Sequence, residues 1–415
     1  MSPDLYHRRA TCRLCKSSEL ISVVQLTPTP PANAFVAEEG IDQTQSVFPL
    51  ELFFCERCHH VQLLDVVNPD YLFRDYVYVS GTSPSFVRHF EEYAGNIIKR
   101  FQPKPRALVV DIGSNDGTLL KFFQEQGQTV LGIDPAVSIA KAASDAGIET
   151  WPEFFDANTV KRILAEKGKA AVVSANNVFA HADDLAGIAD NIRALLAPDG
   201  VFVFEVSYLG DVYEDILFDT IYHEHVAYHS VGPLKQFFAA YGLDLFSVCR
   251  VSSHGGSIRG LVQIAGGPWR SDESVEALIA HEQALKIDRA ETWSNYGEKI
   301  ISVGERLRGL LSEIKGEGKS VAGFGAPAKA TTLMYHFGLG PDIIDFIADD
   351  SPLKQGLYSP GLHIPVIPAI EIYQRKPDYR IILAWNFAKP IMDNHKKFRD
   401  DGGKFILPLP RVEIY

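Results

Sequence analysis

The pattern of apolar and polar residues predicts two α/β units along the chain. Four apolar runs alternate with amphipathic stretches in the first unit: "ALVVDIG" (107–113), "VLGIDPA" (130–136), "AVVSANN" (171–177) and "VFVFEV" (201–206). Apolar strands spaced by helices are typical of a parallel, doubly wound sheet. The sequence therefore predicts an α/β fold with the sheet beginning near residue 107.

A second alternating unit follows a long helical stretch, expected around 272–317. Its strands are "SVAGFGA" (320–326), "IDFIADD" (344–350) and "RIILAWN" (380–386). A cysteine-bearing module precedes both units. We therefore expect three domains, spanning residues 1–75, 76–271 and 272–415.

Composition and charge exclude some classes of partner. The chain has 415 residues, of which 46% are hydrophobic and 22% charged, with a net charge of −12. This acidic balance argues against nucleic acid as a partner, because phosphate binding requires clustered Lys and Arg. No apolar run is long enough to cross a bilayer, and the first residues show no apolar signal segment. We expect no membrane association, a cytoplasmic location, and a monomer or weak dimer.

Four of the five cysteines form two pairs, Cys12/Cys15 and Cys55/Cys58. Two C-x-x-C knuckles supply four thiolates that can converge tetrahedrally on Zn²⁺, and this closed ligand set predicts a structural metal. The alternative is two unrelated pairs or disulfides, which a reducing compartment disfavours. Cys249 is expected to be a buried small apolar residue rather than a nucleophile.

The turn "DIGSNDG" follows the first predicted strand and leads into a helix. Its pattern, Asp111-x-Gly113-x-x-x-Gly117, fits the first turn of S-adenosylmethionine enzymes, where glycines let the backbone approach the ligand. Asp134 ends the next strand, where a carboxylate can bind both ribose hydroxyls. Phe154 or Phe155 would flank the adenine, and "SANN" would close the floor of the site. The alternative is a packing turn with no ligand.

A second glycine turn, "GFGAPAKATT", resembles a nicotinamide fingerprint more than the first does. It reads Gly323-x-Gly325-x-x-Ala328, and its following strand ends in Asp349 and Asp350. An NAD-dependent oxidoreductase is therefore a rival hypothesis. Lys329 enters the helix directly, and a lysine there also suits the diphosphate of a nucleotide-linked substrate.

Motifs along the whole chain resemble those of the sugar C-methyltransferases, including the C-3′-methyltransferases of deoxysugar biosynthesis. The two knuckles, "YVYVSGTS", "DIGSNDG", "FDTIYHEH", "SSHGGSIR", "GAPAKATT", "IADDSPLKQG" and "ILAWNF" occur in that family's order, from Cys12 to about Tyr415. The resemblance implies a zinc-binding N-terminal module, a class I S-adenosylmethionine-dependent methyltransferase (Rossmann-like) domain, and a C-terminal Rossmann-like domain. It implies methyl transfer to carbon of a nucleotide-linked 4-keto-6-deoxysugar, with dTDP as the expected nucleotide.

The matched motifs supply candidate binding residues. For the methyl donor these are Asp111, Gly113, Asn115, Asp116, Gly117, Asp134, Phe155 and Asn176. For the nucleotide-sugar they are Ser80, His254, Arg259, Lys329, Lys354 and Asn386.

The stretch "FDTIYHEHVAYHS" (218–230), here called the His-rich segment, carries the expected catalytic groups. The C-3 hydrogen of a 4-keto sugar is α to a carbonyl, so a base that titrates near neutral pH can form an enolate. We expect His225 to be that base, with Tyr222 as its partner if the stretch turns helically. Glu224 would orient the imidazole or hold a sugar hydroxyl.

The remaining polar residues near this segment have plainer interpretations as well. By family match, His181 and Tyr76 reach the same cleft and join the catalytic set. His223 and His229 are expected to be solvated surface residues, so replacing His223 should be tolerated.

Two further hypotheses are C-methylation at another carbon, such as C-5, and a non-catalytic zinc-bearing binding protein.

Overall fold

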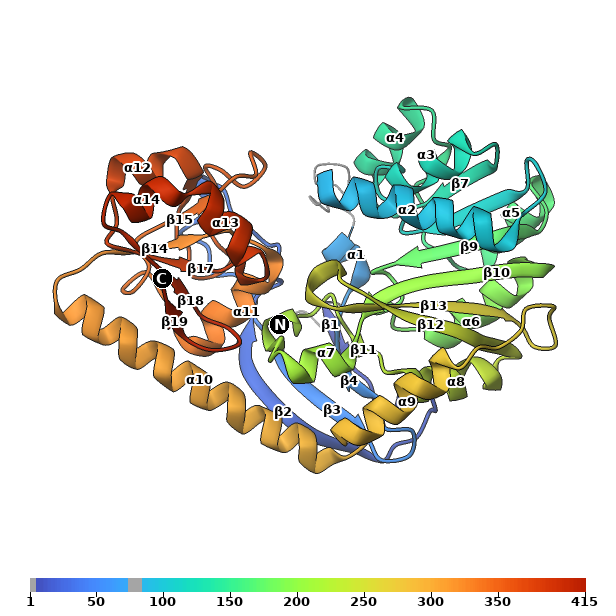
Figure 1. Cartoon of the computed structure of the whole chain (residues 1–415), viewed down its shortest axis with the longest axis horizontal. Helices are drawn as coiled ribbons and strands as arrows, with labels where there is room; N and C mark the ends of the chain where they lie inside the picture. Colours follow the sequence, from blue (N-terminus) through green and yellow to red (C-terminus); the bar gives the residue numbers. More distant parts are fainter. Residues whose placement is uncertain (1–4, 74–83) are drawn as a thin grey trace.

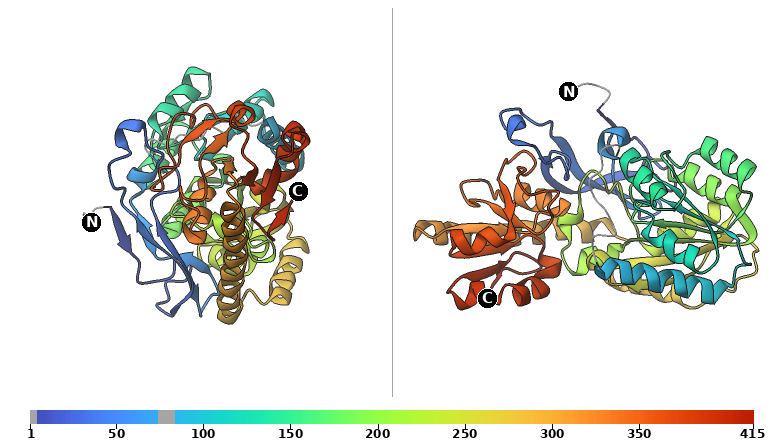
Figure 2. Two further views of the ribbon diagram at one scale, coloured as in Figure 1. Left: turned by 90° about the vertical axis from the view of Figure 1, so that its left-hand side faces the viewer. Right: turned by 90° about the horizontal axis from the view of Figure 1, so that it is seen from above.

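Three units follow one another in the computed structural model, which describes residues 5–73 and 84–415. The C-terminal unit (orange to red) and the central unit (cyan to yellow) lie apart in Figure 1, and the N-terminal module (blue) runs between them. The view from above in Figure 2 shows the same arrangement. Tyr76 and Ser80 lie outside the described residues.

The N-terminal module is built from two small antiparallel sheets. β1 pairs with β5, and the other sheet has the order β11-β4-β3-β2. Alternating burial along β3 places Phe48, Leu50 and Leu52 on the buried face. The elements are β1 (Tyr6–Arg8), β2 (Leu20–Thr29), η1 (Glu38–Gly40), β3 (Phe48–Cys55), β4 (Val61–Leu63), β5 (Asp65–Val67) and α1 (Pro69–Phe73).

The central unit contains a seven-stranded sheet of order β12-β13-β10-β9-β6-β7-β8. Strands β6 to β10 are parallel as predicted, but β12 and β13 add an antiparallel edge that the alternation pattern does not reveal. The connections reverse direction between β6 and β9, the point where ligands bind in such sheets. The carboxyl ends of these two strands are therefore the expected place for a site.

The elements of the central unit account for the predicted strands and their covering helices. They are α2 (Pro84–Phe101), β6 (Leu108–Ile112), α3 (Thr118–Glu125), β7 (Thr129–Ile133), α4 (Val137–Asp145), β8 (Thr150–Trp151), α5 (Ala157–Glu166), β9 (Ala170–Asn176), α6 (Leu185–Leu195), β10 (Leu196–Ser207), α7 (Leu209–Glu214), η3 (Phe218–Thr220), β11 (Ala227–Tyr228), α8 (Val231–Ala240), β12 (Leu243–Val251), η4 (Ser253–Gly255) and β13 (Ser257–Ile264).

The predicted helical stretch consists of two helices, α9 (Ser274–Leu285) and α10 (Ala290–Gly316). The first ends at Lys286, which adopts a left-handed conformation with φ 58°. Helix α9 packs on α8 and β12 of the central unit, whereas α10 packs on β2 and α11. The spacer therefore contacts all three units (Figure 1).

The C-terminal unit has a six-stranded sheet of order β16-β15-β14-β17-β18-β19. Its connections reverse between β14 and β17, and only β19 is antiparallel to its neighbour. The elements are β14 (Val321–Phe324), α11 (Ala328–Phe337), β15 (Ile347–Asp349), β16 (Val366–Pro368), η5 (Ala369–Glu371), α12 (Ile372–Arg375), β17 (Tyr379–Ile382), η6 (Trp385–Phe387), α13 (Ala388–Asn394), α14 (Lys396–Asp400), β18 (Lys404–Leu407) and β19 (Glu413–Ile414).

The apolar core joins the units. One buried cluster combines residues of β2, α7, α10 and the C-terminal sheet, so the N-terminal module and the C-terminal unit share a core. Within residues 5–73 and 84–415, no helix combines the length and apolar character that a membrane span requires.

Candidate active site

The four paired cysteines meet in one cluster, as their spacing predicts. Their sulfur atoms all lie within 4.8 Å of one another. Cys12 Sγ is 3.6 Å from Cys58 Sγ, and Cys15 Sγ is 3.5 Å from Cys55 Sγ. These separations are far longer than a disulfide bond, so all four thiols are free. Cys249, by contrast, is exposed on β12, which corrects the expectation that it is buried.

The cysteine cluster fits a tetrahedral Zn²⁺ ion. Four sulfurs at the usual Zn–S distance of about 2.3 Å lie roughly 3.8 Å apart, close to the observed spacing. Hydrogen bonds from the neighbouring thiols lower the pKa of Cys12, and the same sharing raises the pKa of Cys55 to about 12. Cys12, Cys55 and Cys58 thus compete for one negative charge, and a bound divalent cation would allow all of them to be thiolates. With all four ligands supplied by protein, the site is structural.

The first glycine turn sits at the carboxyl end of β6, against the loop that follows β9. Gly113 has φ +67°, and a Cβ added there would overlap Val178 Cγ2. Gly117 has φ +76°, and an added Cβ would lie 2.8 Å from Ile148 Cγ2. Both positions therefore require glycine, because neighbouring side chains lie too close to leave room for a Cβ atom. The loop that carries Val178 continues to His181, which links this turn to the His-rich segment.

Two buried carboxyl groups line the turn. Ser174 Oγ donates to Asp111 Oδ1 at 2.6 Å, and burial raises the pKa of Asp111 to about 7. Asp134 Oδ2 accepts the N–H of Asn115 at 2.8 Å, and Oδ1 accepts the N–H of Ala136 at 2.9 Å. Each carboxylate oxygen has two lone pairs, so Asp134 retains acceptor capacity for two ribose hydroxyls.

The other predicted donor-site residues surround these groups. Asp116 Oδ1 accepts from Thr118 Oγ1 at 2.7 Å at the start of α3. Asn115 takes φ 52°, Phe155 is buried, and Asn176 ends β9. The residues therefore fit S-adenosylmethionine: the Asp134 carboxylate for the ribose, a glycine turn for the methionine portion, and an aromatic wall after β8.

The second glycine turn is built like the first. Gly325 has φ +83°, and an added Cβ would lie 2.6 Å from Ala384 Cβ. Asp349 Oδ2 accepts the N–H of Ala326 at 2.5 Å, and Oδ1 accepts the N–H of Ser351 at 2.7 Å. The local shape of the two glycine turns therefore does not show which of them binds the methyl donor. The residues around each turn have to distinguish them.

Three of the predicted catalytic side chains come together at the His-rich segment. The rings of Tyr222 and His225 have centroids 4.1 Å apart, and His225 lies 5.0 Å from His181. Phe73, at the end of α1, stacks on His181 at 5.7 Å. The pairing of Tyr222 with His225 was predicted on the assumption of a helical turn, but residues 222–225 form a non-helical turn. In this turn His225 N donates to Tyr222 O at 2.8 Å. The turn still brings the two rings together.

The tautomer of His225 is set by the backbone. His225 Nδ1 lies 2.8 Å from Thr220 O, and a carbonyl oxygen only accepts, so Nδ1 carries the proton. In the neutral imidazole, Nε2 is then the unprotonated nitrogen. His225 is thus oriented to accept a proton at Nε2.

Glu224 interacts with residues of the other two units. It is buried, and its Oε1 accepts from Asn33 Nδ2 of the N-terminal module at 2.8 Å. Burial lowers the pKa of Lys354, and the negative charges of Asp349 and Glu224 partly oppose this shift. Lys354 Nζ donates to Ala326 O at 2.6 Å. A carboxylate from the His-rich segment and an ammonium from the C-terminal unit therefore lie in one polar region.

The prediction that His223 and His229 are solvated is wrong. Both are buried: His223 Nε2 donates to Pro49 O at 3.1 Å, and His229 Nε2 donates to Phe179 O at 3.4 Å. Burial lowers the pKa of His223 to about 4 and that of His229 to about 3. His229 also stacks on His60, which follows the second cysteine knuckle. These histidines attach the segment to the N-terminal module.

Two of the predicted nucleotide-sugar ligands are engaged by buried carboxylates. Arg259 Nε donates to Glu205 Oε1 at 2.6 Å, and its guanidinium lies 4.0 Å from the Tyr93 ring. Lys329 Nζ lies 3.6 Å from Asp219 Oδ2. Asn386 follows Trp385, whose Nε1 donates to the same Asp219 oxygen at 2.6 Å. His254 lies in η4, and its side chain is outside the described part of the structure.

Sequence reasoning missed several residues that hold the site. They are Asn33, Phe73, Thr220 and Asp219. Asp219 and Thr220 lie inside the His-rich segment, so their closeness to His225 in the sequence could have indicated that they contact the site. Asn33 and Phe73 are brought in by tertiary contacts, which no local pattern indicates.

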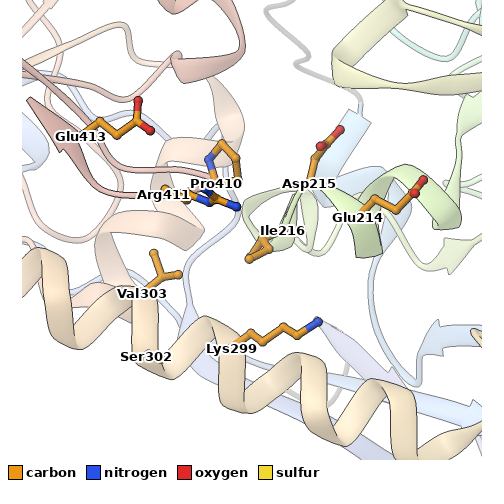
Figure 3. Close-up of a pocket in the computed structure, with 9 residues that line it drawn as sticks. All are labelled: Glu214, Asp215, Ile216, Lys299, Ser302, Val303, Pro410, Arg411 and Glu413. Carbon is orange, nitrogen blue, oxygen red and sulfur yellow. The ribbon is translucent and has the colours of Figure 1, made fainter. Parts of the chain in front are cut away.

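An open cavity of about 580 Å³ lies elsewhere, between the end of α7, α10 and the chain before β19 (Figure 3). Carboxylates and cations both line it, and the lining includes none of the predicted site residues. Its residues are Glu214, Asp215, Ile216, Lys299, Ser302, Val303, Pro410, Arg411 and Glu413.

Models of three protein families match consecutive parts of the chain. Residues 12–73 match a putative zinc binding domain, residues 86–248 a methyltransferase domain, and residues 252–410 the C-methyltransferase C-terminal domain. The first glycine turn therefore lies in the methyltransferase match, and the second in the C-terminal match.

Known proteins resemble the chain over different lengths. The C-methyltransferase NovU of Streptomyces niveus is 36% identical over 403 residues, which cover 97% of this chain and 96% of NovU. A ubiquinone biosynthesis O-methyltransferase of Methylobacterium is 32% identical over 106 residues, covering 24% of this chain and 41% of that protein. A solved S-adenosylmethionine-dependent methyltransferase of Clostridium acetobutylicum gives a TM-score of 0.37 at 11% identity, covering 43% of this chain and 92% of that one.

Proposed function

The chain belongs to the family of S-adenosylmethionine-dependent C-methyltransferases, and from this premise we propose that it methylates C-3 of a nucleotide-linked 4-keto-6-deoxysugar. The observation that carries the proposal is the orientation of His225 beside Tyr222 and His181. Carbon becomes a nucleophile only after it loses a proton, so a C-methyltransferase needs a base at this point.

His225 is the proposed base. Thr220 O holds the Nδ1 proton, so Nε2 takes the C-3 proton and the C–H electron pair moves into an enolate whose charge rests on the C-4 oxygen. Tyr222 donates a hydrogen bond to that oxygen. S-adenosylmethionine supplies the electrophilic methyl group when it is bound. His181 and Tyr76 complete the proposed catalytic set, and Glu224 holds a sugar hydroxyl.

The proposed substrate contacts residues from more than one unit. The first glycine turn with Asp134 is the proposed donor site, and the loop after β9, which packs on Gly113 through Val178, leads to His181. Ser80, His254, Arg259, Lys354 and Asn386 are the proposed contacts to the nucleotide-sugar. The Lys354 ammonium and the second glycine turn together favour an anionic group such as a diphosphate.

Proton exchange tests this function independently of methyl transfer. With S-adenosylhomocysteine bound and D₂O as solvent, the protein should exchange the C-3 hydrogen of a dTDP-4-keto-6-deoxysugar, followed by proton NMR. His225→Gln should slow the exchange by at least about 100-fold, the usual contribution of a general base. Its affinity for the donor product should remain within about twofold, because the imidazole acts in the transition state.

The position of exchange separates the alternatives. Both C-3 and C-5 are α to the C-4 carbonyl, so exchange at C-5 alone would move the reaction to that carbon. Normal C-3 exchange by the His225→Gln variant would place the base elsewhere, with His181 as the next candidate.

A further inference from the structure

Helix α11 of the C-terminal unit holds the His-rich segment at two points. Thr332 Oγ1 donates to Ile221 O at 2.8 Å, and Thr332 is fully buried. One turn earlier, Lys329 Nζ lies 3.6 Å from Asp219 Oδ2. The two contacts therefore fix residues 219 and 221, on either side of Thr220.

Thr220 is the residue whose carbonyl accepts the Nδ1 proton of His225. The direction of that carbonyl depends on the backbone of its neighbours, since the peptide unit between residues 220 and 221 is planar. Apolar contacts add to the attachment, because the Phe218 ring packs on Phe337 of the same helix at 4.9 Å. A displacement of α11 would thus turn the carbonyl and the imidazole together.

We propose that Thr332 and Lys329 are positioning residues for His225, which they act on through the Thr220 carbonyl. The C-terminal unit would then contribute to the proton transfer itself as well as to substrate binding. The inference rests on the proposed role of His225 as the base.

The environment of Lys329 favours this role over direct contact with a diphosphate. Its side chain is 12% exposed, and its ammonium lies 4.0 Å from the Trp385 ring. Asp219 is fully buried, so departure of the ammonium would leave a carboxylate in the core without its cationic partner, beside the Trp385 N–H. Removing one partner of such a pair is strongly unfavourable. The ammonium is therefore committed to Asp219.

The first test replaces the threonine. Thr332→Val removes the hydroxyl and should lower the rate constant of C-3 exchange about 10- to 100-fold, the range expected for a misplaced catalytic group. KM for the nucleotide-sugar should stay within about twofold, and Thr332→Ser should restore most of the rate. Thr292→Val is the matched control: Thr292 Oγ1 also donates to a backbone carbonyl, that of Lys286, but lies in α10. Its exchange rate should match the wild type.

The second test separates positioning from substrate binding at Lys329. Lys329→Met should lower the exchange rate constant and leave KM unchanged. A raised KM with an unchanged rate constant would make Lys329 a substrate ligand and overturn its assignment. Thr332→Val keeps the proposal testable if the Lys329 variant does not fold.

A third measurement does not depend on the substrate. Nitrogen-15 NMR of the imidazoles, with His225 assigned by comparison with His225→Gln, should show the Nδ1–H tautomer in the wild type and a mixture in Thr332→Val. A wild-type tautomer and a wild-type exchange rate in Thr332→Val would overturn the inference. If the wild type exchanges no C-3 hydrogen but the tautomer still shifts in the variant, the proposed function fails while the positioning contact stands.

Discussion

Burial distinguishes the histidines of the His-rich segment, although the sequence places them only a few residues apart. The pairing of Tyr222 with His225 was predictable because residues three apart meet in any tight turn. The burial of His223 was not, since it depends on Phe48 and Pro49, more than 170 residues earlier in the chain. Local patterns therefore identified the candidate base but not the residues that support it.

The buried histidines should make the folded state sensitive to acid. Unfolded His223 takes up a proton near pH 6.5, but burial lowers its pKa in the folded protein to about 4. Between these values the unfolded state binds more protons, so the free energy of unfolding falls as the pH falls, by about 1.4 kcal/mol per pH unit. His229 acts in the same direction.

His223→Gln should remove one part of this sensitivity, because the amide can still donate to Pro49 O but does not titrate. From pH 7.5 to 5.0, wild-type protein should lose about 2 kcal/mol more unfolding free energy than the variant, measured by urea denaturation. Identical pH profiles would show that His223 is not the titrating group. Loss of zinc at low pH affects both proteins and cancels in the comparison.

Among the secondary-structure elements, those defined by their own sequence were predictable and those defined by a partner were not. The strands around 107–113 and 320–326 appear as β6 and β14 because apolar runs flanked by glycine turns specify them. β11 has only two residues and exists because Ala227 and Tyr228 pair with Gln62 and Val61 of β4. No pattern near residue 227 indicates that it completes the sheet of the N-terminal module.

The pairing of β11 with β4 should make the His-rich segment depend on zinc. β4 begins three residues after Cys58, and Leu63 N donates to Val226 O at 3.0 Å, next to His225. Zinc binding stabilises the fold around its ligands, so its removal should loosen β4 and then β11.

Cys58→Ser, or chelation of the wild type, should increase amide hydrogen exchange in a peptide covering residues 222–230, measured by mass spectrometry. A peptide covering α5 (residues 157–166), on the central unit, serves as the control and should exchange as before. Unchanged protection of residues 222–230, with zinc loss verified by elemental analysis, would exclude this dependence.

For the whole molecule, the three units converge on the His-rich segment. The N-terminal module pairs with it through β11, the loop after β9 brings His181 to it, and α11 holds it from the C-terminal side. Figure 1 shows the corresponding region, where α7, β11 and α11 lie between the two α/β units. Domain order was predictable from strand alternation and cysteine spacing. This convergence was not, because it depends on contacts between residues hundreds of positions apart.

The presence of two similar glycine turns makes the choice of donor site a question about the whole chain. Gly113 and Gly325 both have positive φ, and a side chain at either meets a neighbouring residue, Val178 or Ala384. The same substitution, glycine to alanine, therefore imposes a comparable local strain in each unit. Only one of the two changes should affect the donor, because only the first turn leads through Val178 to His181.

Gly113→Ala should weaken binding of S-adenosylhomocysteine at least about 10-fold in titration calorimetry, since the displaced turn also carries the Asn115 N–H that orients Asp134. Gly325→Ala should leave this affinity within about twofold and weaken binding of the nucleotide-sugar instead. Circular dichroism of both variants checks that each unit remains folded. The opposite pattern would assign the methyl donor to the C-terminal unit, and tight binding of NADH that Gly325→Ala abolishes would support a nicotinamide site there.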